Sequence, residues 1–171
     1  MISEHRNNAS RNIQCAVVTI SDTRTRQTDK SGQKIIKLLT EADHLVPLYK
    51  IIPDDRELIR MTVEKAIYSD KIDAVILNGG TGISYRDVTI ESIEPLFDKQ
   101  IPGFGELFRH LSYQYDIGTA SILSRAACGV ANNCLVFSIP GSTGAVTLAM
   151  ERLILPEIGH MVKEVNKDIH K

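Results

Sequence analysis

The sequence predicts an α/β fold in which a parallel sheet is covered by helices on both faces. Two observations predict this fold. Apolar runs rich in β-branched residues alternate along the chain with longer segments of helical periodicity, which is the order of βαβ units. The runs at residues 15–20 and 74–77 are apolar throughout rather than at every second position, as expected of strands buried on both faces.

The expected strands fall into two groups. Residues 15–20, 46–52 and 74–77 are predicted to form the main strands, and Pro53 ends the second of these. Residues 129–131 and 134–139 flank Asn132-Asn133, which predicts a small β-hairpin with a two-residue turn.

Helical spacing of apolar residues predicts five helices: 31–42, 54–69, a short one near 89, 103–115, and a long one from about 143. Ser31 is the expected N-cap of the first, and Asp54 with Glu57 forms an acidic capping box for the second. Pro156 is expected to kink the last helix or divide it in two.

Length and composition restrict the class of protein. The 171 residues suffice for one domain, expected over residues 14–171 after a poorly ordered N-terminus at residues 1–13. Lys plus Arg total 20 and Asp plus Glu total 21, so the net charge of −1 argues against a general nucleic-acid binder. Because the chain has neither a signal-peptide pattern nor an apolar run of about 20 residues, we expect a cytoplasmic protein without membrane contact. Three cysteines are too few for a disulfide scaffold.

Polar or glycine-rich loops follow three of the predicted strands. They are Ser21-Asp22, residues 78–87 and residues 140–144. In parallel sheets, ligands bind outside the carboxyl ends of the strands, so the shared placement of these loops predicts one ligand site.

The second of these loops contains Gly79-Gly80-Thr81-Gly82, whose backbone amides are unobstructed and can surround an anion. The segment lacks the Gly-Lys-Ser/Thr of a Walker loop, and Tyr85 stands where a dinucleotide fingerprint needs its third glycine. A tight turn between a strand and a helix is the alternative explanation of these glycines.

Charged residues beside the glycines add candidate chemistry. Arg86 can neutralise charge developing on a phosphate, and Asp87 can hold Mg²⁺. Asp54 follows the second strand and can share the same cation, since two carboxylates with phosphate and water oxygens suit Mg²⁺. Helix capping is the alternative role for Asp54, Asp87 and Thr89.

The third loop, Pro140-Gly141-Ser142 followed by Thr143-Gly144, precedes the last helix. A helix N-terminus presents free amides to an anion, so this loop is a second candidate anion site. A plain N-cap is the alternative.

With these motifs assembled, the sequence resembles the molybdenum cofactor biosynthesis protein B family, which includes the molybdopterin adenylyltransferases. The segments that carry the resemblance run in family order along nearly the whole chain: 19–23, 53–54, 78–89, 102–106, 123–125 and 140–142. The glycine-to-Thr89 block followed by Pro-Gly-Phe-Gly-Glu is the most specific of them.

The resemblance implies a Rossmann-like three-layer sandwich with a mostly parallel sheet. It also implies Mg²⁺-dependent transfer of AMP from ATP to the terminal phosphate of molybdopterin, with Asp54 and Asp87 as the catalytic and metal-binding residues. The implied substrate-binding and nucleotide-binding residues are Ser21, Asp22, Gly79, Gly80, Thr81, Gly82, Arg86, Ser124, Arg125, Pro140, Gly141 and Ser142. A non-catalytic protein that binds molybdopterin in the same pathway is the alternative.

Partners are predicted in the same way. The resemblance implies a homo-oligomer, a trimer or a hexamer, and contacts with other enzymes of molybdenum cofactor biosynthesis. The segment at residues 102–115 is rich in Phe and Leu, and exposed apolar area of that kind marks interfaces. The alternative is that this helix covers the sheet within one subunit, through a face of Phe104, Leu107, Phe108, Leu111 and Tyr115.

Overall fold

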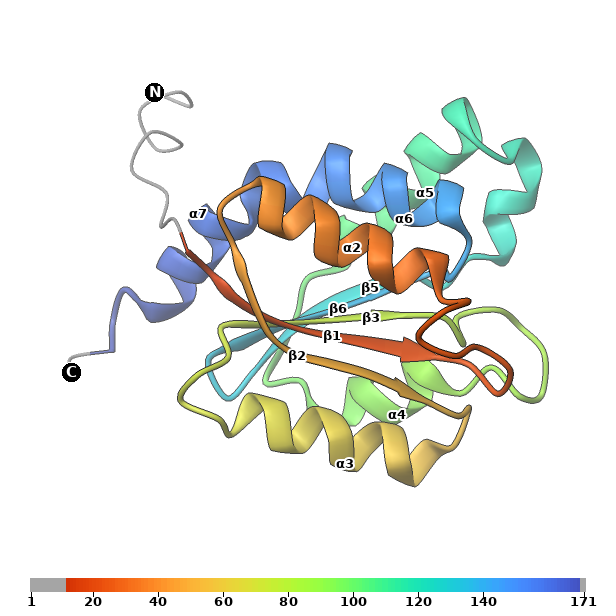
Figure 1. Cartoon of the computed structure of the whole chain (residues 1–171). Coiled ribbons are helices and arrows are strands. Elements are labelled where there is room, and N and C mark those ends of the chain that lie inside the picture. The colour runs from red at the N-terminus through yellow and green to blue at the C-terminus, as the bar shows by residue number, and fades with distance from the viewer. Residues whose placement is uncertain (1–11, 170–171) are drawn as a thin grey trace.

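The computed structural model describes residues 12–169 and shows an α/β fold in three layers, with one sheet between two layers of helices (Figure 1). The described residues form a six-stranded sheet of order β2-β1-β3-β6-β5-β4. The strands are β1 (Gln14–Ile20), β2 (Leu45–Ile52), β3 (Ala74–Asn78), β4 (Lys99–Gln100), β5 (Ala127–Ala131) and β6 (Cys134–Ile139).

The four strands β2, β1, β3 and β6 are parallel, and β5 and β4 extend the sheet in antiparallel pairs. The chain leaves β1 toward β2 on one side and then crosses to β3 on the other side of β1. Loops after β1 and β3 therefore diverge, which leaves a crevice at the carboxyl ends of these strands. The mostly parallel sheet is confirmed.

Two layers of helices enclose the sheet (Figure 1). One face carries α2 (Lys30–Glu41), α5 (Pro102–Tyr115), α6 (Thr143–Ala149) and α7 (Leu155–Asn166), and the other carries α3 (Arg56–Ile67) and α4 (Thr89–Ile93). Two 3₁₀ segments, η1 (Glu94–Leu96) and η2 (Gly118–Leu123), follow α4 and α5, and a π-helical segment, η3 (Met150–Ile154), joins α6 to α7.

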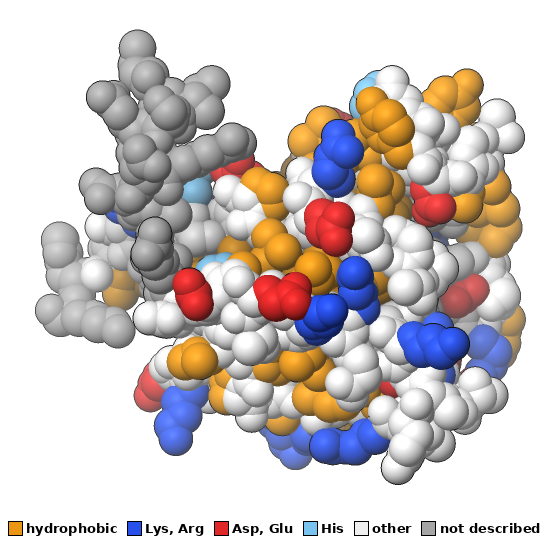
Figure 2. Space-filling model, turned by 45° about the horizontal axis from the view of Figure 1, so that its top comes forward, with side chains coloured by type: hydrophobic (Ala, Val, Ile, Leu, Met, Phe, Trp, Pro, Cys, Tyr) orange, Lys and Arg blue, Asp and Glu red, His pale blue; other side chains and the backbone are white. Residues whose placement is uncertain are grey.

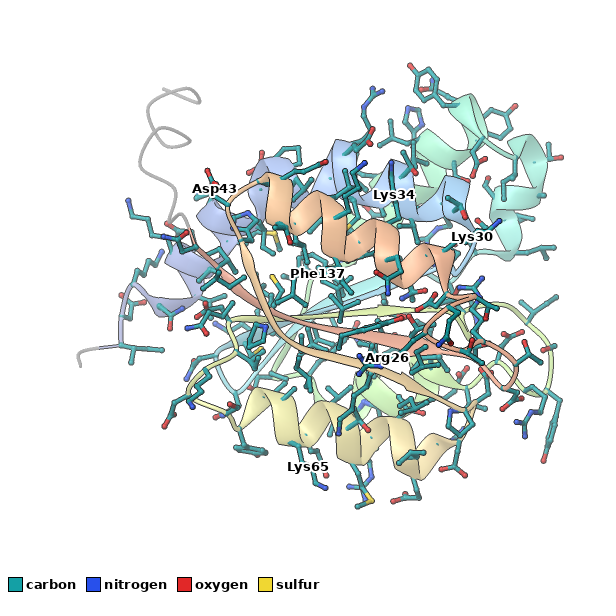
Figure 3. All side chains as sticks on the ribbon, viewed as in Figure 1. Arg26, Lys30, Lys34, Asp43, Lys65 and Phe137 are labelled. Carbon is teal, nitrogen blue, oxygen red and sulfur yellow. The ribbon has the colours of Figure 1, made fainter. Side chains whose placement is uncertain are left out.

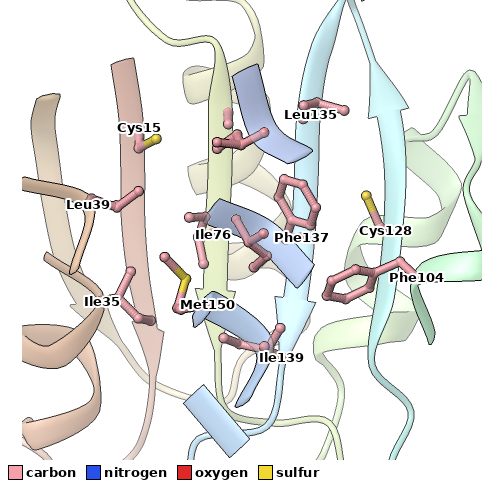
Figure 4. Packing of buried hydrophobic residues seen from close by; sticks show 14 of the residues in the cluster. Cys15, Ile35, Leu39, Ile76, Phe104, Cys128, Leu135, Phe137, Ile139 and Met150 are labelled. Atoms are coloured by element: carbon pink, nitrogen blue, oxygen red, sulfur yellow. The ribbon is translucent and has the colours of Figure 1, made fainter. Parts of the chain in front are cut away.

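Each face of the sheet has its own apolar core. The larger core includes Phe137 on β6, whose ring meets that of Phe104 edge-on with centroids 5.3 Å apart (Figure 4). Cys15 and Cys128 lie in the same core as free thiols, and burial raises the pKa of Cys15 to about 12. The cysteines therefore serve as small apolar residues.

Two predicted N-caps are wrong by one or two residues. Asp29, not Ser31, caps α2 by accepting a hydrogen bond from the Gly32 amide at 3.0 Å. Asp55, not Asp54, caps α3 by accepting from the Leu58 amide at 2.8 Å. The predicted capping box is absent, because Glu57 pairs with Arg60 on the surface of α3. The second correction leaves the Asp54 carboxylate available for other contacts.

Other predictions are confirmed or refined. The hairpin turn has positive φ at both Asn132 (47°) and Asn133 (59°), as its two-residue loop requires. The last helix is divided by η3, directly before Pro156. The strand β4 was missed because two residues carry no periodicity.

The helix α5 buries a different face from the one predicted. Phe104 and Phe108 are in the core, but Ser112 takes the place of Leu111, and Leu107 and Tyr115 are exposed. The helix therefore both covers the sheet and leaves apolar residues on the surface. Figure 2 shows hydrophobic side chains gathered over this end of the molecule, while acidic and basic side chains are interspersed elsewhere on that face.

Two expectations concern parts of the chain at or beyond the described range. Of the N-terminal residues 1–13, only Asn12 and Ile13 are described, and Ile13 is buried. Within residues 12–169, no helix has both the length and the apolarity needed to cross a membrane.

Candidate functional site

Loops from four strands meet at the carboxyl end of the parallel sheet. The amide of Asp54, after β2, donates to the carboxylate of Asp22, after β1, at 3.1 Å. The loop after β6 lies against the loop after β3, since a Cβ added to Gly141 would be 3.2 Å from the Gly79 Cα atom. The sequence-predicted loops are thus brought together at one edge, at the right of Figure 1.

The glycine loop is a tight turn with donor groups left over. Gly79 and Gly80 have φ values of 104° and 64°, which favour glycine. Within residues 12–169, the amides of Gly80, Thr81 and Gly82 donate to no protein acceptor, whereas the Gly79 amide donates to Ile139. Three consecutive unused amides are available as hydrogen-bond donors to an anion.

Thr89 holds this turn from its other side. Its hydroxyl donates to the Gly79 carbonyl at 3.0 Å and its amide donates to the Gly80 carbonyl at 3.1 Å. The alternative role of Thr89 as a helix cap is therefore wrong, since the N-cap of α4 is Val88 and no side chain caps this helix. Both bonds use carbonyl oxygens as acceptors, so they fix the turn without using the amides of residues 80–82.

Asp54 is a half-buried carboxylate beside the glycine turn. A Cβ added to Gly80 would be 2.8 Å from its Oδ1 atom. Burial raises the pKa of Asp54, and the negative charges of Asp22 and Asp87 raise it further, against a smaller opposing effect of Arg86. Asp54 is thus repelled by both neighbouring carboxylates, and a cation bound beside it would relieve this repulsion.

Asp87 and Arg86 lie on the loop that leads from the glycine turn to α4. Asp87 Oδ2 accepts from the amide and the hydroxyl of Ser84 at 2.9 and 2.6 Å. Arg86 pairs with Asp22 at 2.5 Å, and this hydrogen bond holds the pKa of Asp22 below its usual range. Arg86 and Asp22 are both exposed, so a phosphate can replace Asp22 as the partner of the guanidinium at little cost.

Two clefts adjoin the glycine turn and share Asp87. The aspartate cleft has a volume of about 640 Å³, and the charged residues Asp54, Arg56, Arg86 and Asp87 are among those that line it. The serine cleft has a volume of about 400 Å³ and is bordered by residues 80–82, residues 140–142, α5 and η2.

The serine cleft combines apolar walls with unused hydroxyls. Phe108, Ile117 and Leu123 line it, together with Ser112 and Ser124. The hydroxyls of Ser112 and Ser124 are buried and have no hydrogen-bond partner within the described part of the chain. Buried unpaired hydroxyls are costly unless a ligand satisfies them, so the cleft suits a ring with polar edges.

Ser142 and Ser21 have structural contacts of their own. Ser142 is the N-cap of α6, and its Oγ atom accepts from the Ala145 amide at 3.2 Å. Ser21 Oγ accepts from the amides of Thr23 and Arg24, both at 3.2 Å. Neither hydroxyl donates to a protein acceptor within residues 12–169, so both can donate to a ligand.

Arg125 braces the loop between the glycine turn and α4. Its guanidinium donates to the carbonyls of Gly82 and Asp87, at 2.8 and 3.0 Å, and forms a two-pronged ion pair with Glu91. The hydrogen bond from Arg125 holds the pKa of Glu91 below its usual range. Since these partners occupy its donors, Arg125 contributes to the site by fixing the loop.

The protein supplies only part of the set of oxygen ligands that Mg²⁺ needs. Within residues 12–169, no group of three or more His, Cys, Asp or Glu side chains is arranged to hold a metal ion. Asp54 and Asp87 nevertheless flank the glycine turn, since Cβ atoms added at Gly80 and Gly82 would be 2.8 and 2.7 Å from their carboxylate oxygens. Two carboxylates, completed by phosphate and water oxygens, match the way Mg²⁺ is bound beside phosphates.

Sequence reasoning missed a polar cluster below these loops. Asp29 is fully buried and accepts hydrogen bonds from Thr19 (2.5 Å) and Tyr49 (2.6 Å), and it pairs with Arg24 (3.2 Å). The signal for Asp29 was present, because Asp precedes the predicted helix at a capping position. No sequence signal singled out Arg24.

Comparisons with known proteins agree with this architecture. Residues 16–160 match the family model described as "Probable molybdopterin binding domain". The chain is 52% identical over 167 residues to molybdenum cofactor biosynthesis protein B of Bacillus subtilis (strain 168), covering 98% of each chain.

Solved structures give the same result. A crystal structure of molybdenum cofactor biosynthesis protein B has a TM-score of 0.91 and 52% identity, covering 94% of this chain and 100% of that one. The tungsten cofactor synthesizing protein MoaB from Pyrococcus furiosus has a TM-score of 0.82 and 40% identity, covering 92% and 99%. Because it shares its fold and nearly its full length with these proteins, the chain belongs to the molybdenum cofactor biosynthesis protein B family.

Proposed function

We propose that this protein transfers AMP from ATP to the terminal phosphate of molybdopterin and releases pyrophosphate. The observation that carries the proposal is the juxtaposition of three unused amides, at residues 80–82, with the carboxylates of Asp54 and Asp87. Amides that bind phosphate oxygens beside two acidic groups that hold a divalent cation are the parts that nucleotidyl transfer needs.

The reaction requires positioning more than acid–base chemistry. A phosphate oxygen of molybdopterin attacks the α-phosphorus of ATP, and the bond from that phosphorus to the oxygen bridging to the β-phosphate breaks as pyrophosphate leaves. The nucleophile is already anionic, which is consistent with a site lined by carboxylates, Arg and amides. Holding the two substrates in line contributes on the order of 7–11 kcal/mol.

Each group of the site has a role in this scheme. The amides at residues 80–82 hold phosphate oxygens, and Arg86 leaves Asp22 to neutralise charge on the triphosphate. Mg²⁺ held by Asp54 and Asp87 would supply further neutralisation of the phosphate oxygens. Thr89 and Arg125 keep the loop in place while the charge moves.

The two clefts suit different parts of the substrates. The aspartate cleft, with Arg56 and Arg86, suits the triphosphate of ATP. The serine cleft suits the pterin, since its apolar walls accept a flat ring and the hydroxyls of Ser112 and Ser124 can bond to the ring's polar edge. The two clefts share Asp87, beside which the two phosphates must meet.

Asp87→Asn tests the proposal against the alternative of a non-catalytic molybdopterin-binding protein. The variant keeps the shape and the Ser84 hydrogen bonds but weakens the metal ligand. We expect pyrophosphate release to fall by at least about 100-fold. Molybdopterin affinity should change by less than about tenfold, measured by direct titration. A wild-type protein that binds molybdopterin but releases no pyrophosphate favours the binding protein instead.

We also propose that the protein is a homo-oligomer, a trimer or a hexamer. The support is the group of exposed apolar side chains on α5 and η2: Leu107, Tyr113, Tyr115, Ile117, Ile122 and Leu123. A surface of this kind marks a protein interface, and a second copy of this chain is the partner proposed here. Other enzymes of the pathway are proposed as further partners.

A further inference from the structure

A buried carboxylate lies beneath the loops of the site and takes no part in the chemistry proposed above. Asp29 is 0% exposed, and its oxygens accept from Thr19, Tyr49 and the Gly32 amide and pair with Arg24. A Cβ at position 32 would be 2.1 Å from Asp29 Oδ2, so only glycine there leaves room for the carboxylate. Burial raises the pKa of Asp29, but these hydrogen bonds outweigh it and the net shift is downward.

The contacts of Asp29 connect it to both loops that border the serine cleft. Thr19, its partner on β1, accepts from Asn78 at 2.9 Å, and Asn78 directly precedes Gly79. On the other side, Arg24 donates to Asp29 at 3.2 Å and to the Gly141 carbonyl at 2.9 Å. One carboxylate is therefore linked to the strand end before the glycine turn and to the turn after β6.

The Gly141 carbonyl is held by two side chains that come from elsewhere in the sequence. Besides Arg24, Ser31 donates to it at 2.6 Å. Gly141 is packed against Gly79, with only 3.2 Å between its added Cβ and the Gly79 Cα atom. A shift of the carbonyl therefore moves the turn at residues 140–142 relative to the glycine turn, and changes the width of the serine cleft.

We propose that Asp29 and Arg24 are positioning residues for molybdopterin: the buried carboxylate orients the guanidinium, and the guanidinium fixes the Gly141 carbonyl so that the two turns keep the spacing the ligand needs. The inference rests on the proposed location of molybdopterin in the serine cleft. It does not depend on adenylyl transfer, because it concerns affinity for molybdopterin alone.

The chain offers a matched control for Arg24. Arg26, labelled in Figure 3, lies two residues away. Its guanidinium packs over the ring of Tyr49, 5.3 Å from the centroid. The hydrogen bond to the Gly141 carbonyl comes from Arg24 and not from Arg26. Arg26→Met therefore removes a cation from the same loop without breaking the link between Asp29 and Gly141.

The test is a double-mutant cycle on the dissociation constant of molybdopterin, measured without ATP for Asp29→Asn, Arg24→Met, the double variant and Arg26→Met. We expect each of the first two changes to weaken binding about tenfold, and the double variant to weaken it by the same factor, because both break one chain of contacts. Arg26→Met should bind as wild type. In pyrophosphate release, Arg24→Met should raise the KM for molybdopterin about tenfold and leave kcat nearly unchanged.

Stability is measured beside binding, because Asp29→Asn changes a buried group. Arg24 is one-third exposed, so Arg24→Met should leave the Tm within about 3 °C of wild type and keeps the inference testable if Asp29→Asn unfolds. Equal affinity of Arg24→Met and Arg26→Met overturns the inference, as do additive losses of about 100-fold in the double variant. If the binding pattern holds but no pyrophosphate is released, the inference stands and the proposed function fails.

Discussion

The adjacent residues Asp54 and Asp55 have opposite effects on the stability of the fold. Asp55 caps α3, and Asp54 is half-buried beside two other carboxylates with a pKa above the usual value of 3.8. An Asp whose pKa is higher in the folded state destabilises the fold when ionised. The destabilising free energy from ionised Asp54 is absent below about pH 3.8 and fully present above the folded-state pKa of this residue.

Asp54→Asn is therefore expected to raise the Tm at pH 7, with the gain shrinking as the pH falls toward 3.8. The same variant should lower pyrophosphate release by at least about 100-fold. Asp55→Ala should instead lower stability by about 1 kcal/mol, since it removes an N-cap. Thermal unfolding measured from pH 4 to 8 distinguishes Asp54→Asn from Asp55→Ala. If Asp54→Asn lowers the Tm at pH 7, the ionised Asp54 carboxylate does not destabilise the fold and its pKa is not raised.

Mg²⁺ gives a second test of the same residue. In the absence of nucleotide, added Mg²⁺ should raise the Tm of the wild type, because binding to the folded state alone stabilises it. Asp54→Asn should lose most of this shift. If Mg²⁺ raises the Tm of the wild type and of Asp54→Asn equally, the cation binds at a site that does not include Asp54.

At the scale of elements, the glycine turn should tolerate no side chain at position 80. Gly80 has a φ of 64°, and a Cβ there would be 2.2 Å from Thr89 Oγ1. Gly80→Ala is expected to cost more than about 1 kcal/mol of stability. Gly103, in the first turn of α5, has no heavy atom within 4 Å of an added Cβ, so Gly103→Ala should stabilise by about 0.4–1 kcal/mol. Denaturant unfolding compares the two variants, and equal effects would refute the argument.

The contacts of the Arg125 guanidinium give a prediction about local motion. Lys at this position supplies one compact ammonium in place of a fork that reaches Gly82, Asp87 and Glu91 together. Arg125→Lys should therefore raise amide hydrogen exchange in residues 83–88 on the order of tenfold, with exchange in β1 and β3 unchanged. Exchange that rises equally throughout the sheet would indicate global destabilisation instead.

Much of this element structure was predictable because it depends on local pattern. Continuous apolar runs located β1 and β3, and Asn132-Asn133 located the hairpin. The N-caps were misplaced because Asp29, Ser31, Asp54 and Asp55 are all suitable capping residues, and only the backbone course decides between neighbours. The links from Arg24 and Ser31 to Gly141 join positions 117 and 110 residues apart, which no local pattern reveals.

At the scale of the whole molecule, the exposed apolar group on α5 and η2 predicts self-association. Ile122 is 81% exposed within the described chain, and Ile122→Glu should dissociate the oligomer if that surface is the interface. Tyr68, 72% exposed at the end of α3 on the opposite face of the sheet, provides the control variant Tyr68→Glu. Sedimentation velocity should show an oligomer for wild type and Tyr68→Glu only; a wild-type species of 19.0 kDa contradicts the proposal.

The central claim is that the glycine turn and its two aspartates form an adenylyl transfer site. The most direct measurement follows the label from ATP carrying a radioactive α-phosphate, incubated with molybdopterin, Mg²⁺ and the wild-type protein. We expect the label to move to molybdopterin in equal amount to the pyrophosphate released, and Asp87→Asn to lower this transfer by at least about 100-fold. Molybdopterin that binds to the protein but stays unlabelled would contradict it.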